Sequence, residues 1–201
     1  MMGVTHIFIG TMSSVILTAP ESPGGCLVAL VGGAVGGIVC DIDLGSCKRR
    51  TDVSQAGQLA AGIALACLTA DRLLTIELSR SIRGRTPQEI AAGLTSLATL
   101  YLWGRRQPHR GGTHSLAAAA AFGMCIHLVC GSMLAEPFLI AMLSHLVLDL
   151  LNCRPVRLLY PMRPGFCLRF CGVDGLSDRL LCTVGFWGTI LGIGMYVVRG
   201  R

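Results

Sequence analysis

The chain has 201 residues, enough for one domain or one helical bundle and too few for two independent catalytic modules. Apolar residues make up 52% of it, charged residues 14%, and the mean hydropathy is +0.64. Soluble proteins carry about 25% charged residues, so this sequence has roughly half of the usual supply for a water-facing surface. The composition excludes a disordered chain and disfavours a cytosolic globule. We expect a single membrane-integrated domain over residues 1–201.

Seven segments without Asp, Glu, Lys or Arg follow one another along the chain. They cover residues 1–20, 22–40, 53–70, 90–104, 115–135, 137–148 and 180–198. A helix needs about 20 apolar residues to cross a bilayer, which makes 115–135 and 180–198 the clearest spans, whereas 90–104 and 137–148 need flanking residues. The first segment lacks a basic start and a small-residue cleavage site, so we do not interpret it as a removable signal peptide. We predict an all-α, membrane-embedded bundle of roughly four to six transmembrane helices.

Glycines are spaced four residues apart inside two of these segments. Such small-xxx-small pairs let helix backbones approach closely within a membrane. The run GGAVGG is not interpreted as a dinucleotide-binding loop, because no strand precedes it and no ribose-binding acid follows. The predicted packing pairs are Gly32/Gly36, Gly33/Gly37 and Gly188/Gly192.

The chain has 17 Lys and Arg against 11 Asp and Glu, and its basic residues stand in clusters between apolar segments. Basic clusters at the ends of apolar segments are typical of the cytoplasmic side of membrane proteins, and they also attract anionic lipid headgroups. We therefore expect membrane lipids as partners and no nucleic acid. The clusters are Lys48/Arg49/Arg50, Arg80/Arg83/Arg85, Arg105/Arg106/Arg110 and Arg154/Arg157/Arg163/Arg169.

Ten cysteines are too few for a disulfide scaffold. Those in the interior of apolar segments are Cys26, Cys67, Cys125, Cys130 and Cys182. Cys167 and Cys171 are spaced i, i+4 in a polar loop, which suits a thiolate pair for a metal. Zinc sites of that kind usually supply four protein ligands, so we keep this pair outside the predicted site.

Histidine and aspartate gather in short polar clusters beside the apolar segments. Such residues are costly at a membrane, which makes them candidates for function. A mixed set of imidazoles and carboxylates suits zinc, which we favour, or manganese or iron, and a bridging carboxylate suits a two-metal site. His127 lies 13 residues after His114, ~20 Å farther along a helix, and we expect it to be structural. The predicted ligands are His6, Asp41, Asp43, His109, His114, His145 and Asp149.

The order of the segments predicts that these seven residues meet at one membrane face. With the N-terminus inside, segments 1–20 and 22–40 form a hairpin, and the 104–114 loop and the end of segment 137–148 return to the inner side. Three of the four basic clusters then lie inside as well. The exception is the cluster Arg80/Arg83/Arg85, which this arrangement places on the outer side. That conflict predicts that segment 53–70 or 90–104 is re-entrant or peripheral and does not span the membrane.

The polar motifs occur in the order T-H, D-x-D, H-R-G-x-T-H-S-L, S-H-x-x-x-D and Y-P, and in this order they resemble the YdjM-like family. Its members are described as inner-membrane-associated, metal-dependent hydrolases, some of them linked to the LexA regulon. The most specific pieces are HRGGTHSL (109–116) and SHLVLDLLN (144–152), and the match covers most of the chain. The resemblance implies a multi-pass protein of the bacterial inner membrane in which the seven residues above form the metal-binding cluster.

The chain departs from the family pattern at two places. Cys40 stands where the family usually has a proline before D-x-D, and residues 173–178 match a T-G-S-x-x-E pattern only loosely. Asp178 is therefore a weak counterpart of the family's glutamate.

Our leading hypothesis is metal-assisted hydrolysis at the cytoplasmic membrane surface, acting on a phosphoester or other ester of a lipid or membrane-proximal substrate. Asp41 or Asp43 would bridge two ions or take a proton from water, and Arg110 would hold an anionic oxygen. A phosphate headgroup contact or a topology charge explains Arg110 equally well. Thr113 and Ser115 are expected to cap the helix that starts near residue 115.

Two other functions remain open at the level of sequence. A non-enzymatic membrane protein with a structural or regulatory metal site could dock a cytoplasmic partner on its basic loops. A metal or proton transporter would also use His and Asp, but it would spread them through the depth of the membrane. Here they cluster at segment ends, which counts against transport.

Overall fold

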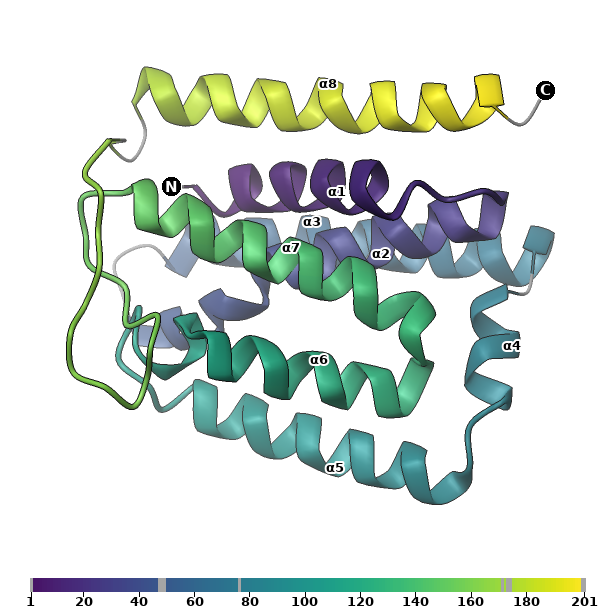
Figure 1. Ribbon diagram of the computed structural model, residues 1–201, viewed down its shortest axis with the longest axis horizontal. Helices are drawn as coiled ribbons and strands as arrows, with labels where there is room; N and C mark the ends of the chain where they lie inside the picture. The colour runs from purple at the N-terminus through teal and green to yellow at the C-terminus, as the bar shows by residue number, and fades with distance from the viewer. Residues whose placement is uncertain (1, 47–49, 76, 171, 173–174, 200–201) are drawn as a thin grey trace.

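The computed structural model describes residues 2–46, 50–75, 77–170, 172 and 175–199 (Figure 1). Within these ranges the regular elements are helices. One isolated antiparallel bridge pairs Val156 with Phe166 in the segment 152–170. The all-α prediction is confirmed. The α-helices are α1 (Gly3–Thr18), α2 (Pro23–Val39), α3 (Arg50–Ala70), α4 (Glu77–Arg83), α5 (Pro87–Gly104), α6 (Leu116–Cys130), α7 (Ser132–Leu151) and α8 (Leu176–Arg199). Shorter helical pieces are η1 (Cys40–Ser46), η2 (Asp71–Thr75) and η3 (Gly112–His114).

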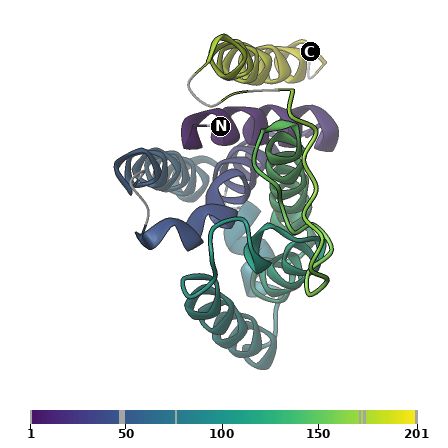
Figure 2. The same cartoon turned by 90° about the vertical axis from the view of Figure 1, so that its left-hand side faces the viewer.

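Helices α1, α2 and α7 form the centre of the bundle, because each packs against the other two. Helix α8 covers α1 on one side, while α6 packs on α7 and α5 on α6 at the other side (Figure 1). Except for α4, which runs across one end, successive helices run in opposite directions along the bundle. The segments 105–115 and 152–170 therefore lie at the same end, which we call the loop end (Figure 2).

Four helices of the described chain are long and apolar enough to cross a membrane: Pro23–Asp43, Ser54–Leu74, Ser132–Leu151 and Leu176–Val198. This number lies within the predicted range. Helix α8 is the least buried of the four, and it exposes large apolar side chains such as Trp187 and Leu191, as a lipid-facing helix does. The predicted hairpin of residues 1–20 and 22–40 is also present, as α1 packed against α2.

The prediction of a continuous span over 115–135 is wrong. Helix α6 ends at Cys130 because Gly131 adopts a positive φ of 79°, a conformation that glycine takes without steric cost. With 15 residues, α6 is shorter than the four candidate spans. Residues 132–136 belong instead to α7, and they provide the flanking length that segment 137–148 needed.

The cluster Arg80/Arg83/Arg85 lies by α4, at the end opposite the loop end (Figure 1). Of the two segments predicted to be re-entrant or peripheral, 53–70 lies in α3, which overlaps one of the four candidate spans. Segment 90–104 lies in α5, which is outside those four and sits at the edge of the bundle on α6. In the fold, α5 is therefore the peripheral one of the two.

The glycines of α2 allow close packing on two faces, as predicted. Gly33 and Gly37 lie against α1, whereas Gly32 and Gly36 lie against α7. A Cβ added at Gly36 would collide with the backbone carbonyl of Phe138. The third predicted pair, on α8, lies against side chains of α1. These contacts hold α1 and α7 against α2 and so fix where their loop-end residues lie.

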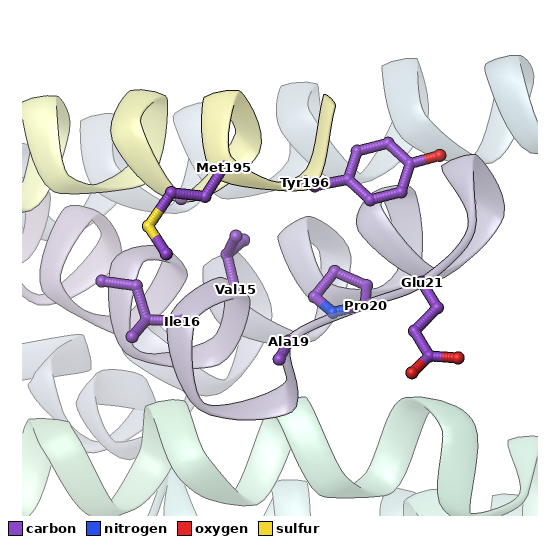
Figure 3. A pocket seen from close by; sticks show the side chains of 8 residues that line it. Val15, Ile16, Ala19, Pro20, Glu21, Met195 and Tyr196 are labelled. Carbon is purple, nitrogen blue, oxygen red and sulfur yellow. The ribbon is translucent and has the colours of Figure 1, made fainter. Parts of the chain in front are cut away.

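A pocket of about 530 Å³ lies at the end opposite the loop end, between α1, the α1–α2 turn and the last turns of α8. Figure 3 shows Met195 of α8 reaching toward Val15 and Ile16 of α1. Its lining is apolar apart from Glu21 and Tyr196, and it includes none of the predicted ligands. This pocket is therefore not the candidate site.

Substituting Gly36 by alanine tests the close packing. We expect Gly36→Ala to lower the stability of the detergent-solubilised protein by about 1–3 kcal/mol, because the added methyl group meets backbone rather than a flexible side chain. Thermal unfolding followed by circular dichroism measures the change.

Gly62→Ala is the matched control, since nothing lies within 4 Å of a Cβ added at that helical position. We expect it to be neutral or to stabilise by up to about 1 kcal/mol through helix propensity. Equal losses of stability in both variants would contradict the packing role of Gly36.

Candidate metal centre

All seven predicted ligands lie at the loop end, which Figure 2 views head-on. The sources are the start of α1, the η1 turn after α2, the 105–115 segment and the last two turns of α7. Six of the side chains are almost fully buried, and His109 is 26% exposed. The seven residues are His6, Asp41, Asp43, His109, His114, His145 and Asp149.

His6, His145 and Asp149 form one group whose ligand atoms all lie within 4.8 Å of one another. The rings of His6 and His145 stack with centroids 3.8 Å apart. Their Nε2 atoms lie 3.7 and 3.8 Å from the two carboxylate oxygens of Asp149. Helices α1 and α7 thus bring two imidazoles and a carboxylate to one point.

Asp41, His109 and His114 form a second group of the same dimensions. The two groups adjoin, because His114 Nε2 lies 3.5 Å from Asp41 Oδ1, 3.4 Å from Asp149 Oδ2 and 3.3 Å from His145 Nε2. The six residues therefore form one contiguous set of donor atoms, made of two groups that could each hold a metal ion.

Backbone and carboxylate acceptors orient three of the four imidazoles. His145 Nδ1 donates to the carbonyl oxygen of Gly37 at 2.8 Å, and His109 Nδ1 donates to Asp43 Oδ1 at 3.0 Å. His114 Nδ1 lies 3.2 Å from Asp43 Oδ2. A carbonyl and a carboxylate only accept, so a hydrogen sits on Nδ1 in each ring, and Nε2 is the ring nitrogen that would bind a metal.

Asp43 lies outside both groups, and its carboxylate is surrounded by donors. It accepts from the backbone N–H of Arg110 at 3.1 Å and from the hydroxyl of Thr113 at 2.7 Å, besides the two imidazoles. With these bonds its oxygens are largely occupied. Its geometry is that of a residue that holds ligands in place.

The two hydroxyls expected to cap the helix near residue 115 behave differently. Ser115 Oγ accepts from the backbone N–H of Ala118 at 3.1 Å and caps α6, as predicted. The capping prediction is wrong for Thr113, because its hydroxyl points to Asp43 instead. Thr113 thus supports the centre.

Arg110 brings its guanidinium inside the site. Its Nη2 donates to Asp149 Oδ1 at 2.7 Å and its Nη1 to the carbonyl oxygen of Arg154 at 2.7 Å. The Nε atom is buried and has no partner among the described residues. Arg110 thus ties Asp149 to the segment that follows α7.

The charges of the centre do not balance without cations. Asp41, Asp43 and Asp149 are buried, and Arg110 is the one buried guanidinium among the described residues that faces them. Burial alone lowers the pKa of His114, but its hydrogen bonds to Asp41 and Asp43 and the charge of Asp149 raise it to about 10. A metal-free centre therefore holds a proton on His114 in place of a metal cation.

The donor set fits a metal ion. It combines imidazole nitrogens whose second nitrogen is fixed by an acceptor with carboxylates that need positive charge. Imidazole and carboxylate together suit zinc, manganese or iron, and not calcium or magnesium, which prefer oxygen alone. The chemistry of the donor atoms thus narrows the ion to zinc, manganese or iron.

Asp178 supports the centre from a distance. It accepts from the hydroxyl of Thr5 at 2.7 Å and from the backbone N–H of Met2 at 3.0 Å, so it anchors the first turn of α1 beside His6. It belongs to neither metal group. Its burial at the start of α8 was not evident from the loosely matching sequence around it.

Three further predictions concern residues away from the centre. His127 lies near the end of α6, opposite the loop end, and belongs to neither group. Cys171 lies outside the described residues, as do Lys48 and Arg49, so the thiolate pair with Cys167 and the first basic cluster stay predictions.

Comparison with known proteins identifies the family. A sequence profile described as YdjM inner membrane protein matches residues 1–199, so the chain belongs to this family. No curated protein and no solved structure matches the chain.

Metal analysis tests the centre directly. We expect the purified full chain to hold one or two equivalents of zinc, manganese or iron, and His114→Ala to lose them because His114 joins the two groups. His127→Ala is the matched control and should keep the metal. Mass spectrometry of detergent-purified samples measures the content, and equal content in both variants would contradict the site.

Metal binding should release a proton. Because the pKa of His114 is raised to about 10, the metal-free protein is protonated there at neutral pH, and the apparent metal affinity should rise with pH until that pKa is passed. Calorimetry of metal binding in two buffers of different ionisation enthalpy counts the protons. Heats that are independent of the buffer would show that His114 is no ligand.

Proposed function

Because the chain belongs to a family of inner membrane proteins, we propose that it is a membrane-bound metal-dependent hydrolase of an ester, with a phosphoester as the leading substrate. The observation that carries this proposal is a buried cluster of imidazoles and carboxylates with one exposed edge, at His109. A divalent ion held there would supply Lewis acidity and lower the pKa of water from 15.7 toward about 7.

The chain's own residues divide the work. His6, His114 and His145 with Asp41 and Asp149 hold the ion or ions, and His109 completes the set at the exposed edge. Asp43 fixes the rings of His109 and His114, so its role in this proposal is positioning.

Asp41 is the carboxylate best placed to take a proton from water. Its contacts are with the imidazoles of His114 and His145, at 3.5 and 3.8 Å, which leaves lone pairs available. Asp149 is instead held by Arg110 at 2.7 Å, and Asp43 is occupied by four donors. Arg110 thus keeps Asp149 oriented and brings positive charge to the centre.

The substrate is expected to lie at the membrane surface. The centre sits at the loop end of a bundle with four candidate membrane spans, so we expect its exposed edge to lie near the membrane surface. This end carries more described arginines than the end near α4, which by the positive-inside tendency favours a cytoplasmic orientation. A lipid or another membrane-proximal ester fits this location.

One observation favours a second function, a structural or regulatory metal site that docks a cytoplasmic partner. Six of the seven side chains are almost fully buried, as in closed structural sites. The two functions differ in what ligand removal does. A structural ion would contribute to folding, whereas a catalytic centre can lose a carboxylate and keep its fold.

The variant Asp41→Asn separates these functions. For an enzyme we expect phosphoester hydrolysis to fall by more than about 100-fold while thermal unfolding changes little, because an amide keeps the shape and removes the proton acceptor. Glu136→Gln, the same chemical change at an exposed position of α7 away from the centre, is the control. Loss of the folded protein in Asp41→Asn alone would favour the structural site, and unchanged hydrolysis would contradict the role of Asp41.

A further inference from the structure

A second, smaller pocket adjoins the metal centre on its exposed side. It has a volume of about 330 Å³ and lies between the segments 105–115 and 152–170. His109, Arg110, Arg157 and Arg163 line it, and prolines and glycines complete its wall. His109 belongs to both the pocket wall and the second metal group. The pocket therefore borders the centre at its most exposed candidate ligand.

The charge of this pocket is positive. Three of its lining residues are arginines and none is acidic. Arg157 and Arg163 are exposed, and neither forms an ion pair with a residue that the structure describes. Arg110 lines the same wall, and its buried Nε has no partner in the described part of the chain. Both observations point to an anion as the missing partner.

The backbone around the pocket is held in place before any ligand binds. The N–H of Arg157 donates to the carbonyl oxygen of Arg110 at 3.3 Å, which ties the two segments together. Val156 and Phe166 bond to each other in both directions at 2.9 Å, and this bridge sets the loop that carries Arg163. A fixed backbone lowers the entropic cost of gathering the arginine side chains around an anion.

We propose that this pocket binds the phosphate group of the substrate and holds it against the metal centre. The inference rests on the proposed function and narrows its substrate class to phosphate esters. Guanidinium groups match the oxygens of a phosphate through paired, charge-assisted hydrogen bonds. In the reaction a water oxygen bonds to phosphorus, the bond from phosphorus to the alcohol oxygen breaks, and the proton of water passes to that alcohol.

Binding of inorganic phosphate to the metal-free full chain tests the pocket without relying on activity. Calorimetry should show that Arg157→Gln/Arg163→Gln weakens phosphate binding by about tenfold or more, the loss expected for charge-assisted hydrogen bonds. Arg105→Gln/Arg106→Gln removes the same charge from exposed positions outside the pocket, and it should change the affinity less than about twofold. Equal weakening in both double variants, or no phosphate binding by the wild type, would overturn the inference.

Competition experiments with the same protein identify the compound that supplies the phosphate group. Displacement of bound inorganic phosphate by vesicles that contain phosphatidic acid, and not by phosphatidylcholine vesicles, would assign the pocket to a lipid headgroup. Displacement by soluble glycerol phosphate alone would assign it to a soluble ester. Both results support the pocket, whereas displacement by neither would overturn it.

Metal content measured on the same protein variants before the metal is removed keeps this test separate from that of the proposed function. Phosphate binding that depends on Arg157 and Arg163 supports the pocket even if the chain binds no metal, which would overturn the hydrolase proposal. The opposite result is normal metal content and normal hydrolysis, together with a phosphate affinity that does not change when both arginines are replaced. It would overturn the proposed phosphate pocket and leave the hydrolase proposal standing.

Discussion

The burial of three carboxylates at one end of an apolar helical bundle is the constraint on which the rest of this structure depends. Removing one charged group from water costs several kcal/mol even after the protein relaxes around it. The cost for a few such groups is about as large as the whole free energy of unfolding of a small domain. Arg110 offsets one of these charges through Asp149, and His114 offsets a second by holding a proton. Cations are needed for the remainder. The convergence of four imidazoles on Asp41 and its neighbours therefore forms groups that could hold a metal ion.

Close helix packing is what makes this convergence geometrically feasible. Gly37 shows the link, because α1 approaches so near that an added Cβ would lie 2.7 Å from the carbonyl oxygen of His6. The carbonyl oxygen of Gly37 itself accepts the bond from His145 Nδ1. One glycine thus admits the helix that carries one ligand and fixes the ring of another. The spacing that promotes packing in the membrane also determines the geometry of the metal centre.

The meeting of the seven His and Asp residues at one end was predictable from the sequence, because alternating crossings place every second segment end together and polar residues stand out in an apolar chain. The end of α6 at Gly131 could not be predicted from the sequence. The apolar run continues through this residue, and the helix ends there because Gly131 adopts a positive φ. The role of Thr113 depends on a hydroxyl direction that no pattern encodes. Arg157 and Arg163 were interpreted as topology charges, because the 152–170 segment has no periodicity from which their position could be inferred.

The placement of those arginines bears on whether the ion is structural or catalytic. Guanidinium groups that line a pocket beside a cation site would repel the cation. A closed structural site gains nothing from such neighbours, since they weaken the binding of its own ion. An anion bound in the pocket would be attracted both to the metal ion and to the guanidinium groups of Arg157 and Arg163. His109, the most exposed ligand, lies on that same side. The arrangement is thus the one expected if the centre receives an anionic ligand from outside, as we propose.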